Sequence, residues 1–151
     1  MEFQEACKIM WDKLGDYKII ALATSTHDHP MIRNVSCIFY HDRIYFKTDK
    51  HFPKTKQLLE NPQVAMCFHG VQVEGKAENK GLVIDEEGRI FEKKYREYLW
   101  GSYNAYSHID TEILIEVTPD FVEIWDDDDK GNAYQILIDF ASQSVEVKPY
   151  D

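Results

Sequence analysis

The sequence has little of what disulfide-stabilised, membrane-spanning or secreted proteins require. Its 151 residues include only three cysteines, Cys7, Cys37 and Cys67, which are too few for a disulfide framework. We interpret each as a small core residue in a reducing compartment. The apolar runs, such as 17–23, are far shorter than the roughly 20 residues that cross a bilayer, and the first residues lack a signal-peptide pattern. We therefore expect one cytoplasmic domain over residues 1–151.

Positive charge is also scarce, with 17 Lys plus Arg against 27 Asp plus Glu and a formal net charge of -10. Such a surface repels polyanions, which argues against nucleic acid or an anionic membrane as a partner. Residues 31–56 are the exception, because six basic and two acidic residues give them +4 while the other 125 residues carry -14. An anionic ligand bound there would relieve the repulsion among these cations, although surface lysines also cluster by chance.

Hydrophobic periodicity predicts a mainly β chain with a few helices. Apolar residues at steps of three and four predict an N-terminal helix over 2–14 and another around 90–99. Pro53 suits the first turn of a short helix that continues to Glu60. Runs rich in Val, Ile, Phe and Tyr predict strands. The expected strands cover residues 17–24, 32–40, 43–48, 63–69, 71–77, 111–117, 121–125, 133–140 and 144–147.

These strands predict a small antiparallel barrel, because closing a sheet removes its exposed edges. Its core would span about 17–126, with residues 127–151 as a C-terminal extension. We expect a two-residue hairpin link at 41–42, a turn at 118–120, and an aromatic, polar loop over 100–108. Short, infrequent helices and the lack of a Gly-x-Gly-x-x-Gly sequence disfavour a doubly wound nucleotide-binding fold.

A candidate phosphate site lies within the basic segment. Arg33 begins one predicted strand, Lys47 and Thr48 end another, and Lys54 lies in the first turn of the short helix. A phosphate monoester needs cations, hydroxyl or backbone donors, and gains from a helix N-terminus. Folding the hairpin would bring all of these together. The alternative is a solvated basic face, which for any one of these residues is the commoner arrangement.

An ordered series of short motifs also resembles the pyridoxamine 5'-phosphate oxidase-like family of FMN-binding split β-barrels. The resemblance runs from about residue 17 to residue 126, and its order is more specific than any single piece. The motifs are Ala21-Leu22-Ala23-Thr24, Pro30-x-x-Arg33-Asn34-Val35, Ile44-Tyr45-Phe46-Lys47-Thr48, Pro53-Lys54, Gln57-Leu58, Asn61-Pro62-x-Val64-Ala65, Val73-Glu74-Gly75, Ile113 to Val117, and Val122-Glu123-Ile124-Trp125-Asp126.

The resemblance implies a six-stranded antiparallel split β-barrel that forms a homodimer, with FMN in a groove between the two subunits. It implies that the FMN phosphate is held by Arg33, Lys47, Thr48 and Lys54, and that the isoalloxazine ring is lined by Asn34, Val35 and Ser36. The cofactor would carry the redox chemistry while the protein orients it. A flavin-dependent oxidoreductase is therefore expected, with a reduced nicotinamide as a possible donor and a small molecule, such as a quinone or nitro compound, as acceptor.

Two departures separate the chain from the oxidase itself. It has His69-Gly70-Val71-Gln72 where the oxidase has Arg-Gln-Val-Arg, and it lacks the oxidase's C-terminal Arg-x-His. Oxidation of pyridoxamine 5'-phosphate is therefore not expected. Two alternatives stay open: a flavin-binding module that stores, senses or shuttles electrons, and an interaction domain that has lost its cofactor. A haem or deazaflavin in place of FMN also stays open.

Other polar groups give weaker signals. Trp100, Tyr103, Tyr106 and His108 could cap a substrate pocket, but Tyr and Trp also favour interfaces, and we expect dimer packing. No metal site is expected, since the histidines at 27 and 29 lack a third ligand and the acidic run 126–129 departs from a calcium loop. No covalent catalyst is assigned.

Overall fold

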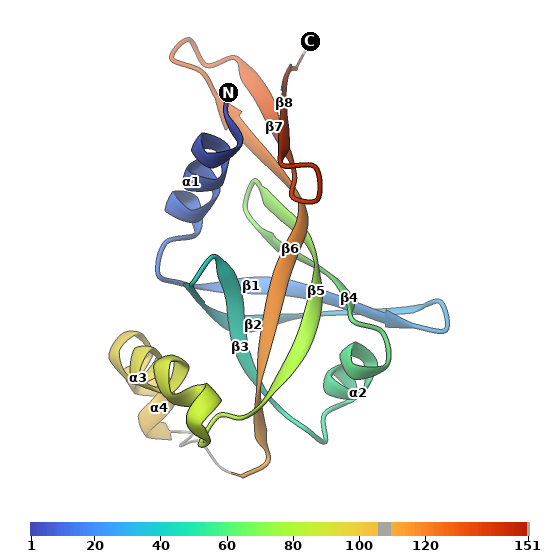
Figure 1. The fold of residues 1–151 in the computed structure, drawn as a ribbon, viewed down its shortest axis with the longest axis vertical. Coiled ribbons are helices and arrows are strands. Elements are labelled where there is room, and N and C mark those ends of the chain that lie inside the picture. Colours follow the sequence, from blue (N-terminus) through green and yellow to red (C-terminus); the bar gives the residue numbers. More distant parts are fainter. Residues whose placement is uncertain (106–109, 151) are drawn as a thin grey trace.

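The computed structural model describes residues 1–105 and 110–150, which form one antiparallel sheet with flanking helices (Figure 1). Its strand order is β3-β2-β1-β4-β5-β6-β7-β8, and a further pairing of β3 with β6 closes the first six strands into a barrel. The elements are α1 (Phe3–Leu14), β1 (Tyr17–Thr26), β2 (His29–Tyr40), β3 (Arg43–Asp49), α2 (Pro53–Glu60), β4 (Gln63–Phe68), β5 (Val71–Leu82), the 3-10 turn η1 (Glu86–Gly88), α3 (Arg89–Tyr98), α4 (Trp100–Ala105), β6 (Glu112–Asp127), β7 (Ala133–Asp139) and β8 (Ser144–Pro149).

The predicted six-stranded antiparallel barrel is confirmed, and its connections follow local chemistry. His41 and Asp42 have φ of 52° and 56°, as the two central residues of a tight hairpin turn require. Pro53 opens α2, where its missing N–H costs nothing. Beyond the barrel, β7 and β8 form a hairpin that extends past it beside α1 (Figure 1).

The expected turn at 118–120 is wrong, because β6 runs unbroken from Glu112 to Asp127. The strand bends there instead: Pro119 pairs with Gly75, next to a register shift between Glu74 and Gly75. A Cβ on Gly75 would lie 2.6 Å from the carbonyl oxygen of Thr118, so only glycine allows this approach. The irregularity accommodates a proline within the sheet and lets one strand serve both the barrel and the extension.

The expected loop at 100–108 also needs correction, because residues 100–105 form helix α4. Tyr103 packs against the core beneath α3, whereas Trp100 is exposed. Residues 106–109 lie outside the described residues.

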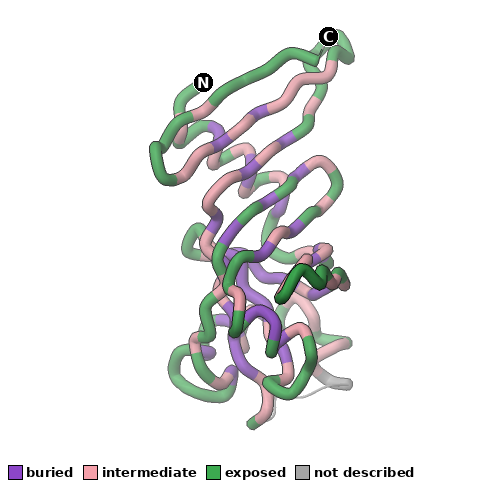
Figure 2. Tube along the Cα trace, turned by 90° about the vertical axis from the view of Figure 1, so that its right-hand side faces the viewer, coloured by how far each residue is buried: buried purple, intermediate pink, exposed green. Residues whose placement is uncertain are grey.

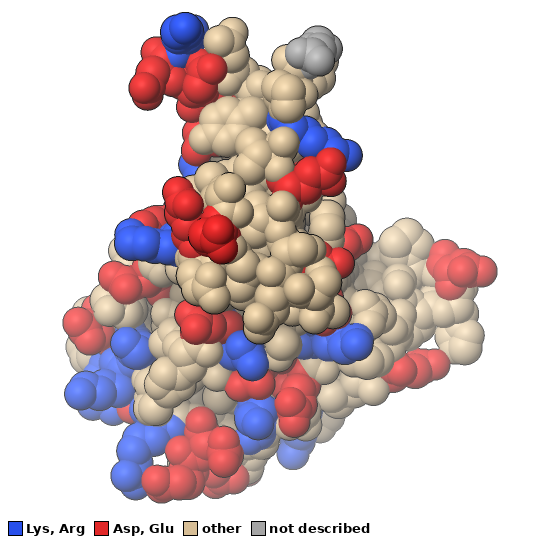
Figure 3. All heavy atoms as spheres, turned by 45° about the horizontal axis from the view of Figure 1, so that its top comes forward, with Lys and Arg blue, Asp and Glu red and all other residues tan. Residues whose placement is uncertain are grey.

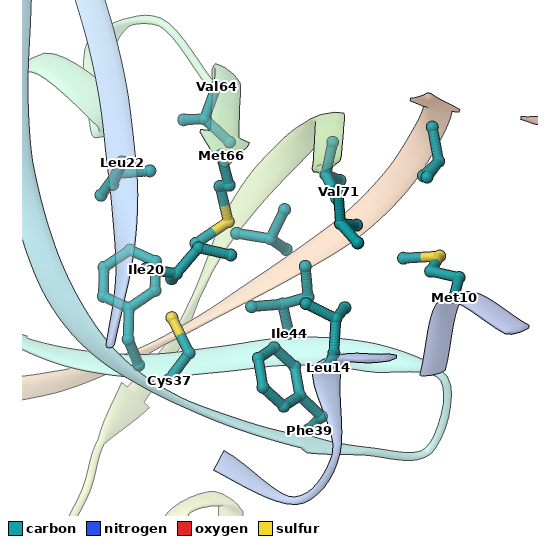
Figure 4. Close-up of a cluster of buried hydrophobic side chains, with 14 of the residues drawn as sticks. Met10, Leu14, Ile20, Leu22, Cys37, Phe39, Ile44, Val64, Met66 and Val71 are labelled. Carbon is teal, nitrogen blue, oxygen red and sulfur yellow. The ribbon is translucent and has the colours of Figure 1, made fainter. Parts of the chain in front are cut away.

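Two apolar clusters hold the structure together. The larger one fills the barrel, and Met10 and Leu14 of α1 point into it (Figure 4); Ala6 of the same helix belongs to this cluster too. The smaller one lies between the outer face of β2 and β3 and helix α3, and it includes Ile38 and Phe91. Buried residues follow the barrel strands in Figure 2, whereas the tip of the β7–β8 extension is exposed. Among the described helices none is long and apolar enough to span a membrane.

Candidate functional site

The barrel is split between β2 and β3. These strands pair only at the end of β2 and the start of β3, from Ile38 with Tyr45 to Tyr40 with Arg43. The preceding part of β2 pairs with β1 alone, and the following part of β3 pairs with β6 alone. Over 29–37 the backbone of β2 therefore has ladder partners on one side only. In an antiparallel strand, half of the N–H and C=O groups point to each side, so this stretch offers main-chain donors and acceptors along an open edge.

Arg33 lies in this open stretch and points to the inner face of the sheet, as do Val35 and Cys37. Its Nη1 donates to Thr24 Oγ1 at 2.8 Å and to the Leu22 carbonyl oxygen at 3.3 Å. Its Nη2 is buried and has no hydrogen-bond partner among the described residues. A buried donor on a cation is costly when unsatisfied, so an anionic acceptor would be stabilised here.

Lys54 of α2 is half-buried beside this guanidinium. Burial, and then the positive charge of Arg33, lower the pKa of Lys54 below its ordinary value. Burial also lowers the pKa of Arg33. Within residues 1–105 and 110–150, neither cation forms an ion pair with a carboxylate. The fold thus places two cations within electrostatic range of each other, and no carboxylate among the described residues neutralises either one.

Thr48 also points inward and is 3% exposed, but its hydroxyl is engaged. It lies 2.8 Å from the hydroxyl of Thr55, which itself donates to the carbonyl oxygen of Asp49 at 2.7 Å. Because Thr55 has one hydroxyl hydrogen, Thr48 must be the donor of their shared bond. Thr48 therefore braces the start of α2 against β3, and contact with a phosphate would require its hydroxyl to turn.

Lys47 does not join the other three residues, which corrects the expectation that all four side chains converge. Neighbouring residues of a strand point to opposite faces, so Lys47 projects outward beneath α3. Its ammonium lies 2.6 Å from Glu112 Oε2 and 5.0 Å from the centre of the Tyr95 ring, and the side chain is 11% exposed. This charge is neutralised locally.

The residues expected along the isoalloxazine ring also lie on opposite faces of their strand. Asn34 is exposed and Ser36 partly exposed on the outer face of β2, while Val35 is buried inside. Val35 can therefore meet a ligand only through its main chain. Figure 3 shows acidic and basic side chains interspersed over the face that it presents, with uncharged residues between them.

The outer face of the sheet around β1 carries small and apolar side chains. Ile19 is 64% exposed and Ile32 72% exposed, and strand alternation places Cys67 on this face too, where it is exposed rather than in the core as expected. A cavity of about 190 Å³ opens here. Its lining residues are Ala21, Ala23, Ile32, Ala65, Met66, Cys67 and Gln72.

The aromatic residues of α4 are only partly described. Trp100 is 57% exposed and stacks on Tyr103 at a centroid distance of 5.7 Å. The hydroxyl groups of Tyr95 and Ser102 are 2.8 Å apart, which ties α4 to α3. Tyr106 and His108, the other two predicted members, lie outside the described residues.

The sequence reasoning missed Thr24 and Gln57 as site residues. They hydrogen-bond to each other at 2.7 Å, and Thr24 also holds Arg33. Both stand in the motif series that carries the family resemblance, but no spacing rule links residues 33 positions apart. Their inward orientation on β1 and α2 was the available signal.

Comparisons with known proteins agree with this architecture. Residues 12–126 match the model of the family described as pyridoxamine 5'-phosphate oxidase. A comparison with curated proteins found no match.

Several solved structures share the fold. PhzG from Burkholderia lata 383, in complex with tetrahydrophenazine-1-carboxylic acid, matches with a TM-score of 0.66 and 14% identity over 99% of this chain and 92% of that one. A pyridoxamine 5'-phosphate oxidase-related, FMN binding protein from Nostoc punctiforme matches with a TM-score of 0.61 and 12% identity, covering 100% and 97%. An FAD-binding protein from Mesorhizobium loti matches with 0.57 and 14%, covering 81% and 92%. At these identities the likeness establishes the fold.

Proposed function

The chain belongs to the pyridoxamine 5'-phosphate oxidase family, and from that premise we propose that it is an FMN-dependent oxidoreductase acting on a small molecule. FMN-binding and FAD-binding proteins among its structural neighbours support a flavin-type cofactor. The observation that carries the choice of FMN is the buried, unpartnered Nη2 of Arg33 beside Lys54. Two cations that no described carboxylate neutralises fit the doubly charged phosphate monoester at the end of FMN.

Different residues along the split would bind different parts of FMN. Arg33 and Lys54 would hold the phosphate, and Thr48 and Thr55 would keep α2 in place above it. The open backbone edge over 33–37 would supply main-chain groups to the polar edge of the flavin. Lys47 has no part in this assignment, because it is paired with Glu112 on the other face.

The bound flavin would supply electron transfer, and the chain would bind and orient it. Where the oxidase has a glutamine, Gly70 lies against the main chain of Trp125, and a Cβ there would be 3.0 Å from the Trp125 carbonyl oxygen. A side-chain contact to the flavin from this position is therefore replaced by backbone packing. We accordingly propose a reductase that uses a reduced nicotinamide and passes electrons to a small acceptor, rather than oxidation of pyridoxamine 5'-phosphate.

We also propose that the outer face around β1 pairs two copies of the chain. Ile19 and Ile32 are large apolar side chains that water would otherwise surround, and Asn34 lies beside them on β2. Burial of such a patch stabilises association. A homodimer formed here would cover the part of the split that carries the proposed flavin-binding edge.

The test is an absorption spectrum of the purified protein and the mass of any ligand released on denaturation. We expect a yellow protein that releases FMN and that steadily consumes reduced nicotinamide when a quinone or nitro acceptor is added. A yellow protein without turnover would instead favour the electron-storing or sensing module. A colourless protein that takes up no added FMN would contradict the proposal and favour an interaction domain, and release of a haem or deazaflavin would contradict the choice of FMN.

A further inference from the structure

Gln57, Thr24 and Arg33 form a chain of hydrogen bonds that crosses from α2 through β1 to β2. Thr24 Oγ1 lies 2.7 Å from Gln57 Oε1 and 2.8 Å from Arg33 Nη1. Thr24 is 2% exposed and Gln57 9% exposed, so water does not compete freely for these groups. The chain joins the helix that carries Lys54 to the strand that carries Arg33.

The direction of each bond follows from which group can donate. A guanidinium donates only, so Thr24 must accept from Arg33. The single hydroxyl hydrogen of Thr24 is then given to Gln57 Oε1. The amide nitrogen of Gln57 faces the carbonyl oxygen of His29 at 3.4 Å, which fixes the amide with its oxygen toward Thr24. Each member can therefore hold only one orientation.

This arrangement uses one terminal nitrogen of Arg33 and leaves the other. Nη1 donates to both Thr24 and Leu22, while Nη2 stays buried with no hydrogen-bond partner in the part of the chain that the structure describes. A planar guanidinium held at Nη1 cannot rotate without breaking both bonds. We infer that Thr24 and Gln57 are positioning residues, which lock the Arg33 guanidinium so that Nη2 remains available for a phosphate monoester.

This inference rests on the proposed phosphate site, but it differs from a purely structural role in what it predicts. If Thr24 and Gln57 only packed α2 on β1, their loss would lower stability and weaken every ligand of the split equally. If they position Arg33, their loss should weaken only the ligands that carry the phosphate. The ratio of FMN affinity to riboflavin affinity separates these cases, because riboflavin has the same ring system without the phosphate.

The experiment titrates the full-length apoprotein with FMN and with riboflavin by flavin fluorescence, and with inorganic phosphate by calorimetry. The variants are Thr24→Val, which removes the hydroxyl at nearly constant shape, Thr24→Ser, which keeps it, and Gln57→Leu. Thr26→Val is the matched control, since it makes the same change two residues along β1. Circular dichroism melting confirms that each variant is folded.

We expect Thr24→Val and Gln57→Leu to lower the FMN-to-riboflavin affinity ratio about tenfold, which corresponds to one charge-assisted hydrogen bond made poorly. Thr24→Ser should restore the ratio to within about twofold of the parent, as a rescue by the retained hydroxyl requires. Thr26→Val should leave it unchanged. Two results would overturn the inference. One is equal weakening of FMN and riboflavin binding. The other is a ratio that Arg33→Ala lowers but that Thr24→Val and Gln57→Leu leave unchanged.

The inorganic phosphate titration distinguishes this inference from the proposed function. Phosphate binding that depends on Arg33 and Thr24, in a protein that takes up no FMN, would support the positioning role and reject FMN as the cofactor. If the protein binds neither FMN nor phosphate, both the positioning role and the proposed function are overturned, because Arg33 would then bind no anion.

Discussion

Arg33 lies close enough to Lys54 for its positive charge to lower the pKa of the lysine ammonium. The two residues come from different elements, β2 and α2, so the fold itself imposes their repulsion. By contrast, the ammonium of Lys47, whose side chain is 11% exposed, is neutralised by Glu112 at 2.6 Å. The contrast indicates a site in which a ligand supplies the negative charge.

The first prediction compares two pairs of cations from the same basic segment. Replacing Arg33 and Lys54 together by Ala should weaken FMN binding at least about a hundredfold, because each charge-assisted hydrogen bond contributes about 1.5–3 kcal/mol. Replacing Arg43, which is partly exposed, and Lys50, which is exposed, removes the same formal charge away from the proposed phosphate site and should change the affinity only slightly. Fluorescence titration measures both, and equal losses would count against the assignment.

The second prediction concerns pH. The phosphate of FMN gains its second negative charge near pH 6, so affinity should rise between about pH 5 and 7. Burial and Arg33 lower the pKa of Lys54 from its ordinary 10.5, so the ammonium should lose its proton, and affinity should fall, at a lower alkaline pH than a free lysine would give. The same lowered pKa means that the unliganded fold is stabilised as pH rises through the folded pKa toward 10.5.

The measurement for this prediction is the dissociation constant of FMN from pH 5 to 10. Lys54→Met should remove the alkaline decline due to this group while leaving the acid limb, and riboflavin should show neither limb. An alkaline decline that persists in Lys54→Met would assign it to another group.

Much of the fold could be predicted from the sequence, because its signals are local. The hairpin link at 41–42, the start of α2 at Pro53 and the helical period of α1 each depend on a few neighbouring residues. The turn expected at 118–120 failed because tertiary pairing overrode a local signal: Gly75 on β5 makes room for Pro119 inside the sheet. Nothing near residue 119 reveals that glycine.

The site could be predicted only in part, because its geometry also depends on tertiary packing. Counting charges identified Arg33 and Lys54, but such a count does not show to which face of the sheet a side chain points. Strand alternation could have separated Lys47 from Thr48, since adjacent residues face opposite sides. The separation of β2 from β3 over 29–37, and the bond from Thr24 to Gln57, depend on how distant segments pack and could not be predicted from spacing.

The third prediction tests the placement of Lys47 directly. Lys47→Met should leave FMN affinity within about twofold of the parent, because the ammonium lies on the far face of β3, while Lys54→Met should lower it at least about tenfold. Lys47→Met should also lower the melting temperature, since Glu112 loses its ionic partner in a setting where its side chain is 18% exposed. Equal effects of the two substitutions on FMN affinity would restore Lys47 to the phosphate site.

The fourth prediction concerns the bend of β6. Gly75→Ala would place a methyl group 2.6 Å from the carbonyl oxygen of Thr118 and 2.9 Å from a methyl group of Val117, and should cost about 1–3 kcal/mol of unfolding free energy. Gly101→Ala is the control, because a Cβ there meets nothing within 4 Å, and helix propensity should make it neutral or slightly stabilising. Urea midpoints measure both changes, and a Gly75→Ala midpoint equal to that of the parent would show that the close approach imposes no constraint.

The last prediction concerns the second copy of the chain. Sedimentation equilibrium should give twice the chain mass for the parent protein. Ile32→Glu places a charge at the centre of the exposed apolar face of β2 and β1, so burying it in a dimer would carry a large desolvation cost. The variant should become monomeric and lose FMN affinity, because the covering subunit would no longer close the split. Ile90→Glu, on an exposed part of α3, should remain dimeric. A parent protein that binds FMN fully as a monomer would show that one chain completes the site, leaving the apolar face without a role in cofactor binding.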